Sequence, residues 1–443
     1  MVTILETLLA FIIVFGILVF IHEFGHFFAA KLVGIRVEVF SFGYGKRLFG
    51  FKKGSTDYRL SLIPMGGYVR FLGEGMFDPG RKLEPDDFMA KNRLQRFLVI
   101  GMGSMMNILL AVVILAAINM VGVTVPEYQE QKPNIGWIEP ESPASRTDLW
   151  IGDEILSINN KKVKTWSDVE LAVGTKPEKR IVLEVKRDGQ ILRIPLLTEK
   201  RTKYDMGYAG FFGRILTQVL MVTANSPAEK GGLKPGDVIQ AINGEPVYYY
   251  RFIEIIESNP EHELEFLIER EGKPLTLHIT PRREGKVGKI GILQSAKSIS
   301  RKYGFFAAVH QSFKDNARMI FLVIDFLKNV FTGQVSTRQI GGPLEIAKFS
   351  YAAFRMGFVA LMLWIAVISL QLGVINLFPI PVFDGGQIFV LMLEGIFRRD
   401  FNPKARQIWM QIGFVIFIFL IVFILLNDFV KRLPNGWEGL LPF

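Results

Sequence analysis

Residues 8–26 read LLAFIIVFGILVFIHEFGH, an uninterrupted apolar run that continues into the motif HEFGH at 22–26. His22 and His26 are four residues apart, so on an α-helix they differ by about 40° and face the same side. Glu23 lies between them in sequence, where it can reach a metal-bound water without ligating the metal. The stretch predicts a zinc site inside an apolar helix, with Glu23 as the catalytic base.

This apolar helix is predicted to remain in the mature protein as a membrane span. No Lys or Arg precedes Lys31, so the segment lacks the basic start of a cleavable signal peptide. An ionisable side chain within a span costs about 2.5 kcal/mol or more, which favours a functional role for the two histidines and Glu23.

The composition fits a polytopic membrane protein with soluble modules. Half of the 443 residues are hydrophobic, the mean hydropathy is +0.29 and the formal net charge is +10. No cysteine is present, so imidazole and carboxylate groups must bind any metal. The basic residues form no continuous arm, so we expect a lipid bilayer and no nucleic acid as partner.

Four stretches satisfy the roughly 20-residue apolar requirement for crossing a bilayer. The loop 31–96 carries thirteen Lys and Arg residues, and the loop after Asp384 is also basic, which predicts that both loops are cytoplasmic. Residues 123–356 and both termini would then lie outside. The predicted spans are about 4–29, 97–122, 357–378 and 409–427.

A third metal ligand is predicted in NLFPIPVFDGG, residues 376–386. Residues 356–383 carry no charge, and Asp384 is the first charged residue after them. Pro379 and Pro381 disfavour helix, and unwound backbone at membrane depth is tolerated where protein covers it or where it lines a wet cavity. We therefore expect Asp384 to ligate zinc. The alternative is a loop-opening Asp before a Gly-Gly turn.

The region between the second and third spans contains a repeat. Residues 142–160 (SPASRTDLWIGDEILSINN) and 226–244 (SPAEKGGLKPGDVIQAING) share nine identical positions at an offset of 84. Both copies resemble bacterial PDZ domains, which bind extended peptides or C-terminal carboxylates. We expect PDZ domains at 123–221 and 222–300, both extracytoplasmic. GYAGFFG (207–213) is interpreted either as the carboxylate loop of the second copy or as a glycine-bearing turn.

Taken together, HEFGH, NLFPIPVFDGG and two PDZ modules between them resemble the bacterial site-2 protease family, of the type that regulates the sigma-E response. The resemblance covers nearly the whole chain. Asn107 in GMGSMMN (101–107) matches a family Asn, whereas Ser104 replaces a Pro and Phe383 replaces a frequent Leu. Residues 58–72 resemble the family's membrane-reentrant β-hairpin, and IGGPLEIAK (340–348) matches a stretch before the third span.

The resemblance implies an intramembrane metalloendopeptidase of the bacterial inner membrane, with one Zn²⁺ per chain. Its core would comprise residues 1–122 and 357–443, with the active site near the cytoplasmic side and the PDZ domains in the periplasm. Expected substrates are single-pass membrane proteins that another protease has already trimmed, such as an anti-sigma factor, and remnant signal peptides. The PDZ domains would act as a size filter or docking site.

Substrate binding is predicted for residues that offer hydrogen bonds to a locally unwound substrate helix. An edge strand within 58–72 can add to the substrate backbone, and side-chain amides can contribute. For the two asparagines the alternative is helix–helix contact within the membrane. The predicted residues are Asn376, Asn107, Gly67, Tyr68, Val69, Pro379 and Pro381.

Two other functions remain open from the sequence. A metal-ion transporter would use membrane His, Glu and Asp residues as a transit path, and an inactive PDZ scaffold would use none of them. The outer region 301–356 also includes 316–333, interpreted as an interfacial helix. His262, His278 and His310 have no ligand spacing and are predicted to be ordinary histidines.

Overall fold

The computed structural model describes residues 2–73, 83–201, 205–333 and 339–430, so the C-terminal end, predicted to face outward, lies outside the described residues. The chain divides into two compact units. The helical unit comprises the described residues within 1–121, 302–332 and 337–443, and the β-rich unit comprises those within 122–301 together with Gly333.

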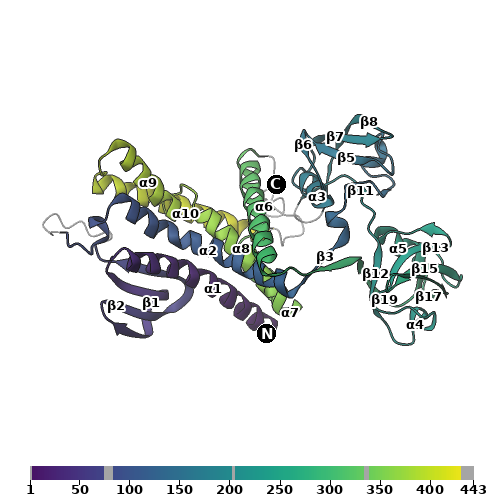
Figure 1. Cartoon of the computed structure of the whole chain (residues 1–443), viewed down its shortest axis with the longest axis horizontal. Helices are drawn as coiled ribbons and strands as arrows, with labels where there is room; N and C mark the ends of the chain where they lie inside the picture. The colour runs from purple at the N-terminus through teal and green to yellow at the C-terminus, as the bar shows by residue number, and fades with distance from the viewer. Residues whose placement is uncertain (1, 74–82, 202–204, 334–338, 431–443) are drawn as a thin grey trace, which may run out of the picture. The chain divides into compact units, whose positions relative to one another are not determined.

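Among the described residues, four helices of the helical unit are long and apolar enough to cross a membrane, and they coincide with the four predicted spans. α2 packs against both α1 and α8 (Figure 1). Buried Val14 and Leu18 of α1 contact Ile365 of α8 in one apolar cluster. The four helices are α1 (Val2–Leu32), α2 (Arg93–Val121), α8 (Phe358–Asn376) and α10 (Pro403–Val430).

Three further helices complete this unit: α6 (Phe305–Phe331), α7 (Pro343–Met356) and α9 (Asp384–Phe397). The sequence placed a helix at 316–333, but α6 begins eleven residues earlier. The buried residues Ala308, Ser312 and Asn316 recur every four positions, so one helical face continues through the earlier segment. α6 packs against α2 and α8 through Met319 and Ile320.

A β-hairpin packs on the end of α1 away from the N-terminus (Figure 1). Its strands are β1 (Val37–Lys53) and β2 (Thr56–Phe71), so it is larger than the predicted 58–72. The strands bend back, and residues 39–42 pair with both 67–70 and 57–60. Val37 and Phe71 are buried in the same apolar cluster as Ala29 of α1.

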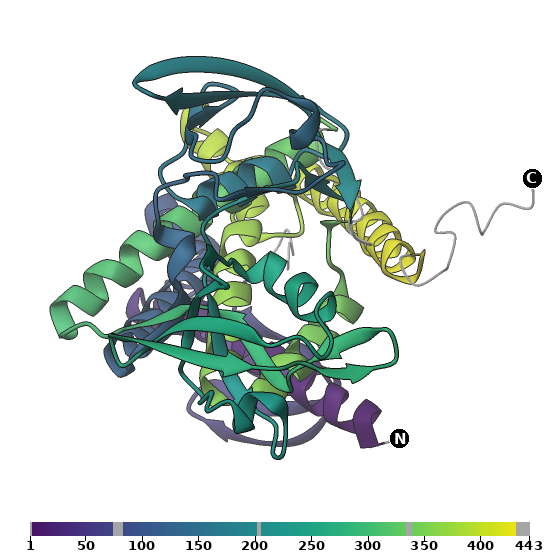
Figure 2. The ribbon, with the colours of Figure 1, turned by 90° about the vertical axis from the view of Figure 1, so that its right-hand side faces the viewer.

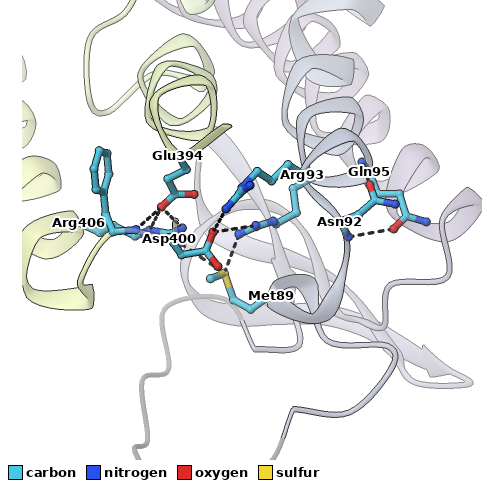
Figure 3. Close-up of polar contacts among 9 residues, drawn as sticks. Met89, Asn92, Arg93, Gln95, Glu394, Asp400 and Arg406 are labelled. Atoms are coloured by element: carbon cyan, nitrogen blue, oxygen red, sulfur yellow. Dashed lines mark hydrogen bonds and ion pairs between the residues drawn. The ribbon is translucent and has the colours of Figure 1, made fainter. Parts of the chain in front are cut away.

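An ion-pair cluster ties α9 and α10 to the start of α2 at the same end of the unit (Figure 3). Buried Glu394 accepts hydrogen bonds from Arg406 Nε at 3.0 Å and Phe401 N at 2.9 Å. Asp400 accepts one from Arg93 at 3.1 Å, and Arg96 lies 3.5 Å from it. The two basic loops therefore lie at one end of the helical unit, as the predicted topology requires. We call Arg93, Arg96, Glu394, Asp400 and Arg406 the Glu394 cluster.

The β-rich unit contains two similar modules, each with its own sheet and apolar core (Figures 1 and 2). The first sheet has the order β6-β5-β7-β8, and the second has the order β16-β15-β13-β12-β19 with β14 paired to β13. The first module contains β4 (Trp137–Ile138), β5 (Glu154–Ile158), β6 (Lys161–Lys162), α3 (Trp166–Gly174), β7 (Arg180–Arg187), β8 (Gln190–Leu197), β9 (Glu199–Arg201), β10 (Met206–Tyr208) and β11 (Phe211–Phe212). The second contains β12 (Thr217–Val222), α4 (Pro227–Lys230), β13 (Val238–Ile242), β14 (Glu245–Pro246), α5 (Tyr249–Glu257), β15 (Leu264–Arg270), β16 (Lys273–Ile279), β17 (Arg282–Glu284), β18 (Val287–Lys289) and β19 (Ile292–Ala296). At the ends of the unit β3 (Val123–Pro126) pairs with β20 (Ser298–Arg301).

The repeated residues occupy equivalent places in the two modules. Gly152 and Gly236 both have positive φ, of 103° and 97°, as the shared turn requires. Asp153 is buried and paired with Arg187 at 2.8 Å. Its counterpart Asp237 is buried and paired with Arg270 at 2.7 Å. The two copies of the predicted sequence repeat therefore have the same local structure.

GYAGFFG belongs to the first module, so the assignment of this loop to the second copy was wrong. Ala144 N donates to Ala209 O at 2.8 Å, and in the second module Ala228 N donates to Ile290 O at 2.9 Å. The loop of the second copy therefore contains Ile290. β12, from Thr217, pairs in the second sheet, so the second module begins before the predicted residue 222.

Candidate metal centre

Three ligand-type side chains meet between α1 and α9. His22 Nε2 lies 3.4 Å from Asp384 Oδ2, and His26 Nε2 lies 3.5 Å from Asp384 Oδ1. The two histidine Nε2 atoms are 3.2 Å apart. One ligand atom from each of the three residues lies within 4.8 Å of the others. The structure thus brings Asp384 together with two histidines that lie 362 and 358 positions before it, and the sequence predicted these three residues as one site.

Two glycines allow α1 and α2 to approach closely here. A Cβ at Gly103 would lie 2.3 Å from His26 Nε2, and a Cβ at Gly25 would lie 2.4 Å from the Met102 carbonyl oxygen. Both distances are shorter than any real Cβ contact. The glycine of HEFGH and that of α2 therefore make room for the metal centre.

Each histidine has a second partner on α2 that orients its ring. His26 Nδ1 lies 2.9 Å from the Val99 carbonyl oxygen, so it donates there and leaves Nε2 free. His22 Nδ1 lies 3.3 Å from the Asn107 side-chain nitrogen, while buried Asn107 Oδ1 has no hydrogen-bond partner among the described residues. Turning that amide places Oδ1 beside His22, so that His22 Nδ1–H donates to Oδ1 and His22 Nε2 is left free for a metal.

Ser104 supports the carboxylate ligand, and sequence reasoning missed it. Its Oγ donates to Asp384 Oδ2 at 2.9 Å, and the residue is fully buried. In the sequence, Ser104 was visible only as a departure from a family Pro. Its position three residues before Asn107 on the same helix was the available signal, because residues three apart lie on one face.

The unwinding predicted around the two prolines is present. Residues 377–383 form turns between α8 and α9, with Ile380 N donating to Phe378 O at 2.7 Å and Phe383 N to Ile380 O at 2.9 Å. A Cβ at Gly385 would lie 2.2 Å from Leu377 O, and one at Gly386 would lie 2.2 Å from Ile380 O. The two glycines let α9 begin directly against this turn, which places Asp384 at its first residue.

Glu23 lies beside the hairpin strand that was predicted to bind substrate. A Cβ at Gly67 would lie 3.1 Å from Glu23 Cγ, so β2 passes directly over this carboxylate. Gly67, Tyr68 and Val69 pair with residues 40–42 on one side. On the other side, no strand within the described ranges pairs with them. Val69 packs into the apolar cluster, and the Tyr68 ring stacks on Tyr44 with centroids 5.9 Å apart.

The remaining predicted residues surround the turn before Asp384. Asn376 is the last residue of α8 and is half-buried, and Pro379 is exposed. Pro381 is buried against α10, where a Cβ at Gly413 would lie 2.2 Å from Pro381 Cβ. His262, His278 and His310 are exposed and belong to no group of metal-ligand type within the part of the chain that the structure describes.

The donor set fits zinc. Two imidazoles and one carboxylate are a common catalytic zinc set, and three protein ligands leave a position for water. The buried oxygen of Asn107 and the space that Gly103 leaves beside His26 fit ligands held in a fixed orientation.

The first module has a groove between α3 and the loop 207–213. The cavity measures about 180 Å³ and is lined by Trp166, Val169, Val173 and Met206 among others. Tyr128, which precedes the module, donates to Glu170 of α3 at 3.0 Å across this groove. Burial, together with the Glu170 carboxylate, raises the pKa of Tyr128 to about 12, so it stays a hydrogen-bond donor.

Family and sequence comparisons identify the chain as a peptidase. The model of peptidase family M50 matches residues 10–420, so the chain belongs to this family. "Protease RseP" of Yersinia pestis is 32% identical, covering 97% of this chain and all of the relative. "Regulator of sigma-E protease RseP" of Escherichia coli and "Putative zinc metalloprotease" of Vibrio cholerae are each 30% identical, with the same coverage. A solved PDZ domain of a Listeria monocytogenes SdrC-like protein matches 19% of this chain and 90% of its own length, at 22% identity and a TM-score of 0.17.

Proposed function

We propose that the chain is a zinc metalloendopeptidase that cleaves the transmembrane segments of single-pass membrane proteins. The observation that carries this proposal is the meeting of His22, His26 and Asp384 inside a unit with four apolar helices. Relatives named as zinc metalloprotease and RseP protease support zinc and peptide hydrolysis. One zinc ion per chain would suffice for the three ligands.

The residues divide the chemistry among them. When bound, zinc would supply Lewis-acid chemistry, which acidifies water and polarises a carbonyl group. Glu23 accepts the proton of the attacking water as oxygen bonds to the scissile carbon. As the carbon–nitrogen bond breaks, Glu23 delivers that proton to the leaving nitrogen. Val99 and Asn107 hold the two imidazoles in the tautomer that presents Nε2.

The hairpin would hold the substrate. A substrate helix hides its peptide bonds in internal hydrogen bonds and must unwind before attack. The outer side of 67–69 offers backbone groups for strand addition, and Gly67 lies next to Glu23. Asn376 and Pro379 lie on the turn that leads to Asp384, where they would contact the same extended segment.

The same proposal assigns a location and partners. The protein would lie in the bacterial inner membrane, with the basic loops cytoplasmic and both the β-rich unit and the termini periplasmic. The two modules would act as PDZ domains that screen or dock substrates already cut by another protease, such as an anti-sigma factor, and remnant signal peptides would be further substrates. α6 would lie at the membrane interface while packing on α2.

No observation favours the transporter or the inactive scaffold. The described residues contain a single group of metal-ligand type, whereas a transport path requires such residues at several depths. An inactive scaffold has no need for a complete ligand set beside Glu23.

Cleavage in cells tests the proposal. A tagged single-span substrate is co-expressed with the wild-type chain, with Glu23→Gln, and with Glu271→Gln as a matched change on an exposed turn. We expect cleavage by the wild type and Glu271→Gln, and a loss of at least 100-fold with Glu23→Gln, because the proton acceptor is removed. Equal cleavage by all three proteins would refute the mechanism.

A further inference from the structure

A polar cavity lies at the base of the β1–β2 hairpin, and it is separate from the metal centre. It measures about 520 Å³ and is lined by residues of β1, β2 and the segment that joins α1 to β1. Five of the lining side chains are cations: Arg36, Arg47, Lys52, Arg59 and Arg70. Neither the metal chemistry nor the proposed substrate strand uses any of them.

The charges in this cavity do not balance. Two carboxylates line it, and they pair with Arg70 and Arg59: Glu38 lies 2.9 Å from Arg70, and Asp57 lies 2.6 Å from Arg59. Arg36 is paired outside the lining with two carboxylates, Asp86 at 2.7 Å and Glu84 at 3.4 Å. Arg47 lies 3.4 Å from Asp57, farther away than Arg59 does. Arg47 and Lys52 therefore supply positive charge in addition to these pairs.

One arginine also has unused hydrogen-bonding capacity. Arg59 Nε is buried, and no acceptor for it is found among the described residues. A buried donor without an acceptor is costly, so an anion that reaches it would be stabilised. Guanidinium groups suit phosphate in particular, because their planar donors match its oxygens.

Exposed apolar side chains begin directly beside the charges. Phe51 precedes Lys52 on β1 and is 61% exposed, and Phe49 is 73% exposed. On β2, Leu60 and Leu62 are 40% and 57% exposed, and Leu60 pairs with Phe49. The exposed apolar side chains of β1 therefore lie between two cations of the cavity, Arg47 and Lys52, in a unit with four apolar helices long enough to span a membrane.

We propose that this cavity binds the phosphate-bearing headgroup of an anionic phospholipid, with the acyl chains lying along the exposed apolar side chains of the hairpin. A free phosphate compound would use the cations but not the apolar surface. A zwitterionic headgroup brings its own cation, which the positive surplus disfavours. β2 carries both Arg70 at the cavity and Gly67 beside Glu23, so bound lipid would steady the strand next to the metal centre.

Lipid counting on the full chain tests this assignment. Protein in mild detergent is titrated with dioleoyl phosphatidylglycerol or dioleoyl phosphatidylcholine, and bound lipid is counted by native mass spectrometry. We expect one tightly held phosphatidylglycerol and much weaker phosphatidylcholine binding. Arg47→Gln/Arg70→Gln should weaken phosphatidylglycerol binding about tenfold or more, since both guanidinium groups that would donate charge-assisted hydrogen bonds to the phosphate are removed.

The matched control is Lys46→Gln/Lys53→Gln, which removes two exposed cations of the same hairpin that do not line the cavity. It should leave the affinity within about twofold. An equal loss of phosphatidylglycerol affinity in both double variants would mean that the lipid is attracted only by the general positive charge of the hairpin. That result would overturn the proposed site. Displacement of the lipid by millimolar inorganic phosphate would reassign the cavity to soluble anions and also overturn it.

A conservative variant guards against misfolding. Arg47→Lys/Arg70→Lys keeps both charges and should retain phosphatidylglycerol selectivity over phosphatidylcholine. Loss of that selectivity in the folded Lys variant, or its absence in the wild type, contradicts the proposal. Because the readout is bound lipid, it is independent of whether the chain cleaves any substrate.

Discussion

At the metal centre, uncharged residues of α2 decide where the ligands can lie. Gly103 gives His26 its space, Asn107 contacts His22, and Ser104 holds Asp384. That His22, His26 and Asp384 lie together was predictable, because imidazole and carboxylate groups in apolar segments have few other uses. Ser104 was not predictable from its identity, since a serine in an apolar helix commonly bonds its own backbone.

Gly103→Ala should reduce zinc affinity roughly 10- to 100-fold, the range seen when the support of a ligand is lost. The new methyl group would lie 2.3 Å from His26 Nε2, so the imidazole must move. Gly101→Ala is the control, because its methyl group would meet only Ile388 Cδ1, at 3.7 Å. Affinity is measured by competition with a zinc chelator. Equal affinities for the two variants would contradict the described contact.

Asn107→Leu, similar in size but without hydrogen-bonding groups, should also lower zinc affinity about 10- to 100-fold because the His22 ring loses its partner. Asn119→Leu removes another buried Asn of α2, away from the centre, and should leave the affinity unchanged. If chelator competition finds wild-type affinity for Asn107→Leu, then Asn107 serves only helix packing, which was the alternative from the sequence.

Among the elements, the repeat was predictable because its identical positions are the buried and turn positions of each module, such as Ile155 and Ile239. The module to which the loop 207–213 belongs was not predictable, because the hydrogen bond from Ala144 to Ala209 joins positions 65 residues apart. The hairpin was underestimated for a different reason. β1 reads VEVFSFGYGKRLFGFKK, where glycines and charges interrupt the alternation that marks a strand.

Arg406→Leu should destabilise the helical unit by about 3–5 kcal/mol, because Glu394 is fully buried and would lose its charge partner. Glu394→Leu/Arg406→Leu should recover most of this loss, since no unpaired charge remains. Arg399→Leu, on the exposed loop of the same region, should stay within about 0.5 kcal/mol. The free energy of unfolding is measured by denaturant titration in micelles. A double variant no more stable than Arg406→Leu would contradict the pairing.

At the scale of the whole molecule, the predicted topology rests on charge and on the common location of the basic loops. The Glu394 cluster joins the start of α2 to the start of α10, so the two basic loops lie at one end of the helical unit, as the predicted topology requires. Charge counting could predict this arrangement without the structure, because the positive-inside rule depends only on loop composition. The same rule predicts which side of the membrane the β-rich unit occupies.

Single-cysteine labelling tests the topology, and the chain suits it because it has no native cysteine. Lys286→Cys, on an exposed turn of the second module, should react with a membrane-impermeant maleimide in intact spheroplasts. Arg399→Cys should react only after the membrane is opened. Labelling of Arg399→Cys in intact spheroplasts would reverse the assigned orientation.

The central claim is that α1 and the turn before α9 together form one zinc site. The most direct measurement is the zinc content of purified full-length protein by mass spectrometry of the metal. We expect one zinc ion per chain in the wild type and in Glu23→Gln, which removes no ligand, and substoichiometric zinc in His22→Ala and Asp384→Asn. Full zinc retention in Asp384→Asn would remove Asp384 from the ligand set and contradict the account.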